Sequence, residues 1–178
     1  MQNFVHLRLH TEFSLADSLV RIGPMVQRVA ELGMPAVAVT DQCNFYGLVK
    51  FFKSATARGI KPLFGVDLLV HEGEEAPTLL SLLACDDRGY ANLRKLISRA
   101  YLEGQHLGNP QVERAWLAQH SEGVIALSGG RQGDVGHALL GGRQEQASAR
   151  LRAWMDIYPD RFYLELQRTG RDGDEDYV

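Results

Sequence analysis

Hydrophobic residues along this chain follow two spacings, one typical of strands and one typical of helices. Near the start, Val5, Leu7 and Leu9 alternate with polar residues at positions 6, 8 and 10. This alternation gives a short strand one apolar and one polar face. Alternation of this kind, or a short continuous apolar run, predicts six strands, over residues 4–9, 36–40, 61–70, 78–84, 124–127 and 162–166.

Apolar residues three and four positions apart indicate helices between these strands. In the segment 90–101, for example, Leu93, Leu96 and Ile97 fall on one face of a helix. Gly33 and Gly59 each follow such a segment, and glycine is the residue that most often ends a helix. The predicted helices cover residues 23–32, 45–58, 90–101, 111–120, 134–140 and 144–157.

The order of strands and helices is typical of the α/β class with a mostly parallel sheet. Two of the predicted strands end in titratable residues, because His10 follows the first and Asp41 follows the second. The carboxyl ends of parallel strands meet at one rim, where βα proteins build their sites. We therefore expect a shared site at that rim.

Composition narrows the functional classes. The chain has 178 residues, which suits one domain with a sizeable core. Its net charge of −3 argues against a chain whose own function is to grip a nucleic-acid backbone. Its two cysteines do not make a disulfide framework, which favours a reducing cytoplasm. The sequence shows neither a membrane-spanning apolar run nor a signal peptide.

Five segments of the sequence carry a family resemblance. They are HTEFSLADSL, GMPAVAVTD, GLVKFFKSATARGIKPLFGVDLLV, ALSGGRQGDVG and FYLELQRTGR. In this order they resemble the polymerase and histidinol phosphatase (PHP) domain, and more narrowly its form at the N-terminus of bacterial DNA polymerase III alpha subunits. The resemblance implies a distorted, TIM-like barrel of seven βα units. Residues 1–178 would then be one N-terminal PHP domain, incomplete at its C-terminal end, with the seventh strand beyond Val178.

The same resemblance implies a function for the longer protein. Such a subunit extends DNA from nucleoside triphosphates with magnesium, in the cytoplasm, and works with a proofreading exonuclease subunit and other replicase subunits. The polymerase's catalytic carboxylates have no counterparts in this chain. For the segment itself we therefore expect no cofactor and no membrane partner, and contact with DNA only through the rest of the protein.

In active members of the family, a cluster of His, Asp and Glu side chains holds two or three metal ions for phosphoester hydrolysis. Carried onto this sequence, the cluster is degenerate. The His-x-His motif reads Arg8-Leu9-His10, Thr-Asp-His reads Thr40-Asp41-Gln42, and Gly-x-Glu reads Gly65-Val66-Asp67. Leu79 stands for a histidine and Gly130 for a cysteine. The degenerate metal-site positions are thus Arg8, His10, Asp17, Asp41, Gln42, Asp67, Leu79 and Gly130.

Arg8 is the most informative of these changes. A guanidinium stays protonated in proteins and cannot ligate a metal, so it places a fixed positive charge where a cation would sit. Carboxylates that converge without a cation repel one another. We therefore expect Arg8 to pair with Asp41, Asp67 or Glu165 and to take the place of the ion. For Asp41 a second interpretation stays open, as the cap of the helix beginning near Cys43.

Two functions from different classes are consistent with these residues. The first is a catalytically degenerate PHP domain that stabilises a DNA polymerase III alpha subunit and docks its partners. The alternative is an active metal-dependent phosphoesterase, either a 3'–5' exonuclease or a pyrophosphatase. Arg8, Gln42 and Leu79 favour the first, since none of them replaces an imidazole ligand.

Overall fold

The computed structural model describes residues 4–15, 17–73, 75–168 and 170. The chain divides into two compact units, a first unit (Met1–Asp67) and a second unit (Leu68–Val178). None of the helices in the described ranges is long and apolar enough to cross a membrane. The polar chain end from residue 171 onward lies outside the described residues.

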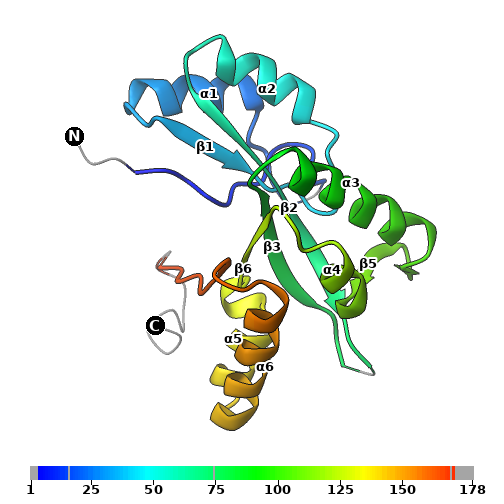
Figure 1. Cartoon of the computed structure of the whole chain (residues 1–178). Helices are drawn as coiled ribbons and strands as arrows, with labels where there is room; N and C mark the ends of the chain where they lie inside the picture. The colour runs from blue at the N-terminus through cyan, green and yellow to red at the C-terminus, as the bar shows by residue number, and fades with distance from the viewer. Residues whose placement is uncertain (1–3, 16, 74, 169, 171–178) are drawn as a thin grey trace. The chain divides into compact units, whose positions relative to one another are not determined.

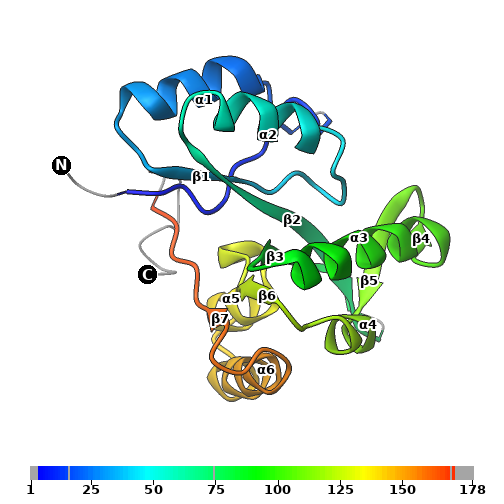
Figure 2. The ribbon, with the colours of Figure 1, turned by 45° about the horizontal axis from the view of Figure 1, so that its top comes forward.

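The first unit places two helices on one side of a short parallel strand pair (Figures 1 and 2). Strand β1 (Ala36–Val39) pairs with the first residues of β2 (Lys61–His71). Helices α1 (Ile22–Glu31) and α2 (Leu48–Thr56) pack against each other. Because α1 is apolar at helical spacing, one of its faces enters the core. That core consists of Ile22, Met25, Val26, Val29, Val37, Val39, Phe51, Ala55 and Ile60.

The segment predicted as the first strand, residues 4–9, is extended chain with little regular pairing. An isolated parallel bridge joins His6 to Val37 of β1, and the backbone N–H of Thr40 donates to the carbonyl of Leu9 at 2.9 Å. The chain bends at Leu7, which interrupts the ladder between these two contacts. The prediction of a regular strand is corrected accordingly, although the segment does lie beside β1.

The second unit is built on an open sheet in the order β4-β5-β2-β3-β6-β7. It contains the end of β2 together with β3 (Thr78–Ala84), β4 (Gln105–His106), β5 (Asn109–Glu113), β6 (Val124–Leu127) and β7 (Phe162–Tyr163). β5 runs parallel to β2, and β7 runs parallel to β6. β3 and β6 are antiparallel, with Ser81 opposite Leu127.

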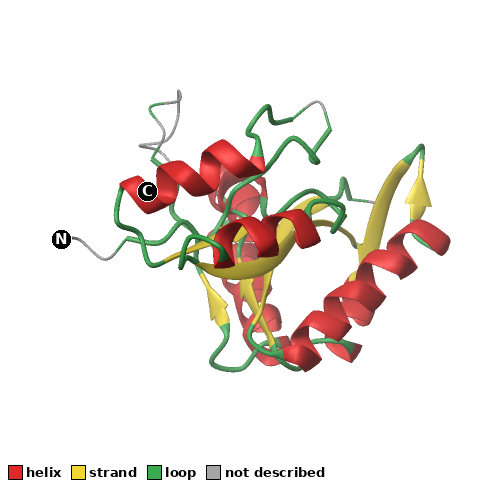
Figure 3. Cartoon of the chain, turned by 90° about the horizontal axis from the view of Figure 1, so that it is seen from above, coloured by secondary structure: helices red, strands yellow, loops and turns green. Residues whose placement is uncertain are grey.

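Helices accompany this sheet. The 16-residue α3 (Asp87–Leu102) runs beside β5 and β4 (Figure 3). It begins where the Asp86 carboxylate accepts a hydrogen bond from the backbone N–H of Gly89 at 2.8 Å. The short α4 (Arg114–Gln119) follows β5. After the 3-10 turn η1 (Gly130–Gln132), α5 (Asp134–Leu140) and α6 (Gln144–Ile157) pack side by side (Figure 1).

Two predictions that concern the second unit need correction. Residues 105–113 form the β4–β5 hairpin, whereas the sequence predicted no strand there and a helix beginning at residue 111. The prediction of a mostly parallel sheet holds only in part, because β1–β2, β2–β5 and β6–β7 are parallel whereas β3–β6 and β4–β5 are antiparallel. Between β3 and β6 lie four elements, so five connections join these two strands, and an odd number of reversals returns the chain in the opposite direction. A single crossover helix would have returned it parallel.

A buried carboxylate ties α4, α5 and α6 together. Asp134 accepts a hydrogen bond from Arg114 Nη2 at 2.7 Å and one from Trp154 Nε1 at 2.9 Å. The Arg114 guanidinium also lies over the Trp154 ring, 4.2 Å from its centroid. The side chains of Asp134 and Arg114 are only 9% and 18% exposed. Each partner in this cluster therefore depends on the others for its hydrogen bonds.

Candidate functional site

The centre of the site is a salt bridge between Arg8 and Asp67. Arg8 Nε donates to Asp67 Oδ2 at 2.8 Å, and the two side chains are 17% and 0% exposed. A carboxylate with no exposure to water needs a cation or strong donors beside it. Arg8 supplies that charge, so one of the three carboxylates predicted to pair with Arg8, Asp67, is its partner.

His10 approaches the same carboxylate from a second direction. Its Nε2 lies 2.7 Å from Asp67 Oδ2, and its Nδ1 is hydrogen-bonded to Asp17. Burial on its own would lower the pKa of His10, but the hydrogen bond and charge of Asp67, with the hydrogen bond of Asp17, outweigh it. The pKa of His10 is therefore raised above its ordinary value. A protonated imidazole donates through both nitrogens, which matches two carboxylate partners.

This raised pKa predicts that His10 stabilises the fold mainly at low pH. The contribution is fully present below the ordinary histidine pKa of about 6.5 and is lost as the pH rises through the raised pKa. His10→Gln should therefore lower the melting temperature at about pH 6 and have much less effect at about pH 9. The exposed His137 on α5 provides the control, since His137→Gln, a surface substitution, should change the melting temperature little. Equal losses at both pH values for His10→Gln would contradict the assignment.

Asp41 has a structural role within the first unit. Its Oδ1 accepts from the backbone N–H of Thr11 and from Ser14 Oγ, both at 2.6 Å, and its Oδ2 accepts from Thr11 Oγ1 at 2.7 Å. The capping interpretation is wrong, because α2 begins only at Leu48 and its N-terminus has no side-chain cap. Asp41 instead fixes the loop that carries His10 and Asp17.

Loss of the Asp41 carboxylate should loosen this loop. Asp41→Ala leaves the buried N–H and hydroxyl of Thr11 without their acceptor, which costs about 1–3 kcal/mol for each unsatisfied group. We expect the free energy of unfolding to fall by about 2–4 kcal/mol in urea denaturation. The exposed Glu31 on α1 provides a matched control, and Glu31→Ala should cost much less. A loss no larger than that of Glu31→Ala would refute this role for Asp41.

The other predicted positions show no arrangement of metal ligands. Gln42 is exposed, and its backbone N–H donates to Ser14 Oγ at 3.0 Å. In the second unit, Leu79 is buried within β3, and Gly130 begins η1 with a positive φ of 58°. Glu165 follows β7, where its backbone N–H donates to Ser128 Oγ at 2.9 Å. None of Gln42, Leu79 and Gly130 supplies an imidazole, carboxylate or thiolate.

The residues at these positions do not fit a multi-metal centre. Across the described ranges, no group of three or more His, Cys, Asp or Glu side chains is arranged to hold a metal ion. Asp67 Oδ2 faces Arg8 Nε at 2.8 Å, and both ring nitrogens of His10 are hydrogen-bonded to carboxylates. A metal there would have to compete with a guanidinium for the same oxygen.

Two residues that hold the site were missed in the sequence. Thr11 and Ser14 are buried, and both donate to Asp41. The available signal was weak: one hydroxyl residue directly after His10 and a second one four positions after it. Hydroxyl groups donate equally well to water or to nearby backbone, so only the folded chain shows which acceptor they use.

Comparison with known proteins places these observations in a family. The family model described as "PHP domain" matches residues 6–169. The DNA polymerase III subunit alpha of Pseudomonas aeruginosa PAO1 is 54% identical over 178 residues, and that of Escherichia coli K12 is 45% identical over the same length. These alignments cover 99% and 98% of this chain, but the chain spans only about 15% of the length of either relative.

A solved structure shows the same fold at low sequence identity. It is that of a proposed metal-dependent phosphoesterase from Bifidobacterium adolescentis, with a TM-score of 0.55 and 14% identity. The alignment covers 97% of this chain and 79% of the other. At this identity the likeness concerns the fold alone.

Proposed function

Because this chain belongs to the PHP domain family, we propose that it is the PHP-domain segment of a DNA polymerase III alpha subunit and is itself non-catalytic. In this proposal, the segment stabilises the polymerase subunit and offers surfaces to its partners. Two protein cations, Arg8 and protonated His10, hold the carboxylate that would otherwise face a metal.

The Arg8–Asp67 salt bridge is the observation that carries the proposal. A guanidinium is charged at every working pH and cannot leave its carboxylate free for an incoming metal ion. It also cannot act as a general base, since it does not deprotonate in proteins. A metal-dependent hydrolase would need a metal ligand in place of Arg8, or space there for the metal ion that generates the attacking hydroxide.

The properties of the longer protein are part of the same proposal. We infer that it is a cytoplasmic, DNA-directed DNA polymerase that uses magnesium and assembles with a proofreading exonuclease subunit and other replicase subunits. Similarity to two polymerase III alpha subunits across nearly the whole chain supports this inference. By the same reasoning, we propose that the open sheet of the second unit belongs to the seven-unit barrel of the family.

The proposal predicts no phosphoesterase activity from the chain. With manganese or zinc supplied, the purified chain should hydrolyse neither bis(p-nitrophenyl) phosphate nor a labelled oligonucleotide above background, because Arg8, Gln42 and Leu79 replace needed ligands. His10→Ala is the control that separates real turnover from a contaminating hydrolase. Metal-dependent turnover that His10→Ala abolishes would establish the alternative, an active phosphoesterase.

A further inference from the structure

The outer face of helix α2 carries apolar side chains that the core of the first unit leaves exposed. Val49 and Phe52 are 67% and 48% exposed, and the exposed Thr56 follows one turn after Phe52. These positions are three and four residues apart in turn, so their side chains form one line along the helix. Lys53 is also exposed and lies beside this line. We call Val49, Phe52, Lys53 and Thr56 the α2 stripe.

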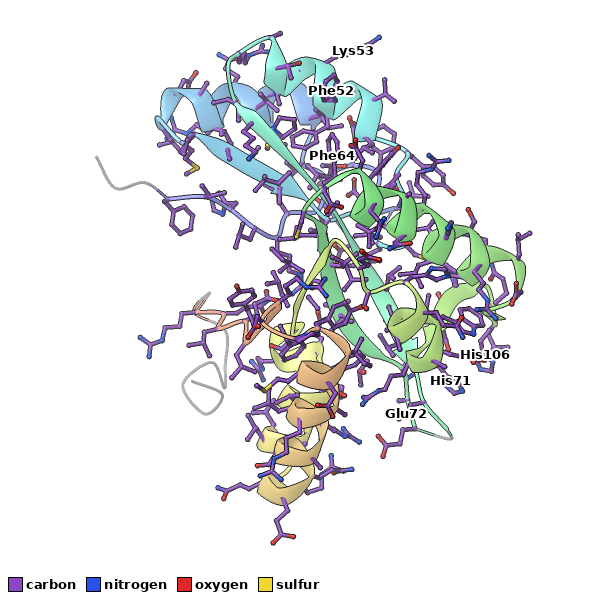
Figure 4. The ribbon with its side chains drawn as sticks, in the orientation of Figure 1. Phe52, Lys53, Phe64, His71, Glu72 and His106 are labelled. Atoms are coloured by element: carbon purple, nitrogen blue, oxygen red, sulfur yellow. The ribbon has the colours of Figure 1, made fainter. Side chains whose placement is uncertain are left out.

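Packing on the other side of α2 fixes the direction in which the stripe points. The helix buries Leu48, Phe51 and Ala55. Phe52 lies at the edge of this buried face, where its ring centroid is 6.3 Å from that of Phe64 on β2 (Figure 4). The stripe therefore cannot turn into the core. Single exposed apolar residues are ordinary, but a continuous apolar line rimmed by polar residues indicates an interaction surface.

The charge around the stripe is positive. Residues 42–66 contain four lysine or arginine residues and no aspartate or glutamate, in a chain whose net charge is −3. Lys50 on α2 is already paired, since its Nζ lies 2.9 Å from Glu12 Oε1. Lys53, in contrast, forms no ion pair with any residue of the described ranges. Its ammonium group is therefore available to a carboxylate of a partner.

We propose that the α2 stripe docks an acidic amphipathic helix of a partner protein. Apolar residues on one face of the partner helix cover Val49 and Phe52, and carboxylates at the edge of that face meet Lys53. A nucleic acid suits the stripe less well, because a phosphate backbone is bound by a row of cations, and the stripe offers one lysine beside an aliphatic side chain. The inference rests on the part of the proposed function in which the segment offers surfaces to its partners.

Titration of the 178-residue chain with synthetic helical peptides of about 15 residues tests the proposal. The first peptide has leucine on one helix face and glutamate on the other, and the second has lysine in place of every glutamate. We expect saturable binding of the leucine–glutamate peptide by calorimetry, with NMR shifts at Val49, Phe52 and Lys53. The leucine–lysine peptide should bind about tenfold more weakly or worse, because its charges repel Lys53.

Two substitutions on the stripe separate docking from folding. Lys53→Glu should weaken binding of the leucine–glutamate peptide about tenfold or more, because it places like charges opposite each other. Val49→Gln should weaken it about tenfold, because the apolar contact of the valine is lost. Both replace exposed side chains, so neither should change the melting temperature appreciably. The matched controls, Lys95→Glu on α3 and Met155→Gln on α6, change exposed residues elsewhere and should bind as the wild type does.

Three results would overturn the proposal. The first is no saturable binding of the leucine–glutamate peptide, or binding that Lys53→Glu leaves unchanged. The second is equal binding of the two peptides, which would show unspecific hydrophobic association. The third is tighter binding of a single-stranded oligothymidylate at the same residues, which would identify a nucleic-acid surface. The phosphoesterase assay tests the non-catalytic assignment separately, so failure of peptide docking and failure of that assignment are distinguishable.

Discussion

Replacing Arg8 with alanine is expected to lower the free energy of unfolding by about 3–5 kcal/mol, because removing one partner of a buried ion pair leaves the other charge uncompensated. Asp67 has no exposure to water, so the carboxylate that remains cannot be solvated in the folded state. His10 still hydrogen-bonds with Asp67 in this variant. The charge of its imidazole depends on pH, however, whereas the charge of the lost guanidinium does not. Urea denaturation followed by circular dichroism gives the measurement.

The matched control for this prediction is Arg28. It pairs with Glu31 across the surface of α1 at 3.2 Å, with side chains 67% and 49% exposed. Such exposed pairs contribute less than about 1 kcal/mol, so Arg28→Ala should change stability little. If Arg8→Ala costs no more than Arg28→Ala, the salt bridge does not hold the site together.

Asp134→Ala should destabilise the second unit by a similar amount, about 3–5 kcal/mol. The change removes the buried carboxylate that pairs with the mostly buried guanidinium of Arg114. Arg114 keeps Glu72 at 3.0 Å, but that carboxylate is 63% exposed and compensates weakly. Trp154 Nε1 loses its acceptor altogether. Both tryptophans of the chain lie in the second unit, so tryptophan fluorescence during urea denaturation reports on it.

Asp156 on α6 serves as the comparison for this change. It is exposed, and no described residue pairs with its side chain. Asp156→Ala should therefore stay within about 0.5 kcal/mol of the wild type, as surface substitutions usually do. Asp134→Ala and Asp156→Ala with the same transition midpoint would show that the buried cluster contributes nothing.

Much of the fold could be predicted because its signals are local. The boundaries of β3, β6, α5 and α6 match the sequence predictions residue for residue, since each is a clear apolar run or a helical repeat. The β4–β5 hairpin was missed because its residues are mostly polar and it contains Pro110. Its strand character depends on pairing with β2, which is distant in sequence.

The residues of the candidate site could be predicted from the sequence, but their pairing could not. Arg8, His10 and Asp67 meet because the extended segment 4–9 lies beside β1, and β1 in turn pairs with the first residues of β2, the strand that carries Asp67. Which carboxylate Arg8 contacts could not be deduced, since Asp41 is equally close to a strand end. The structure resolves this point through Thr11 and Ser14, whose hydroxyls engage Asp41 and fix it in a different role.

The most direct test of the account is the thermal stability of the chain with and without metal. A ligand that binds the folded state raises its stability in proportion to the logarithm of concentration over Kd. We predict that saturating manganese or zinc does not raise the melting temperature, and that EDTA does not lower it, because Arg8 and His10 already hold Asp67. A rise with metal that disappears in His10→Ala would show a working metal centre and contradict the account.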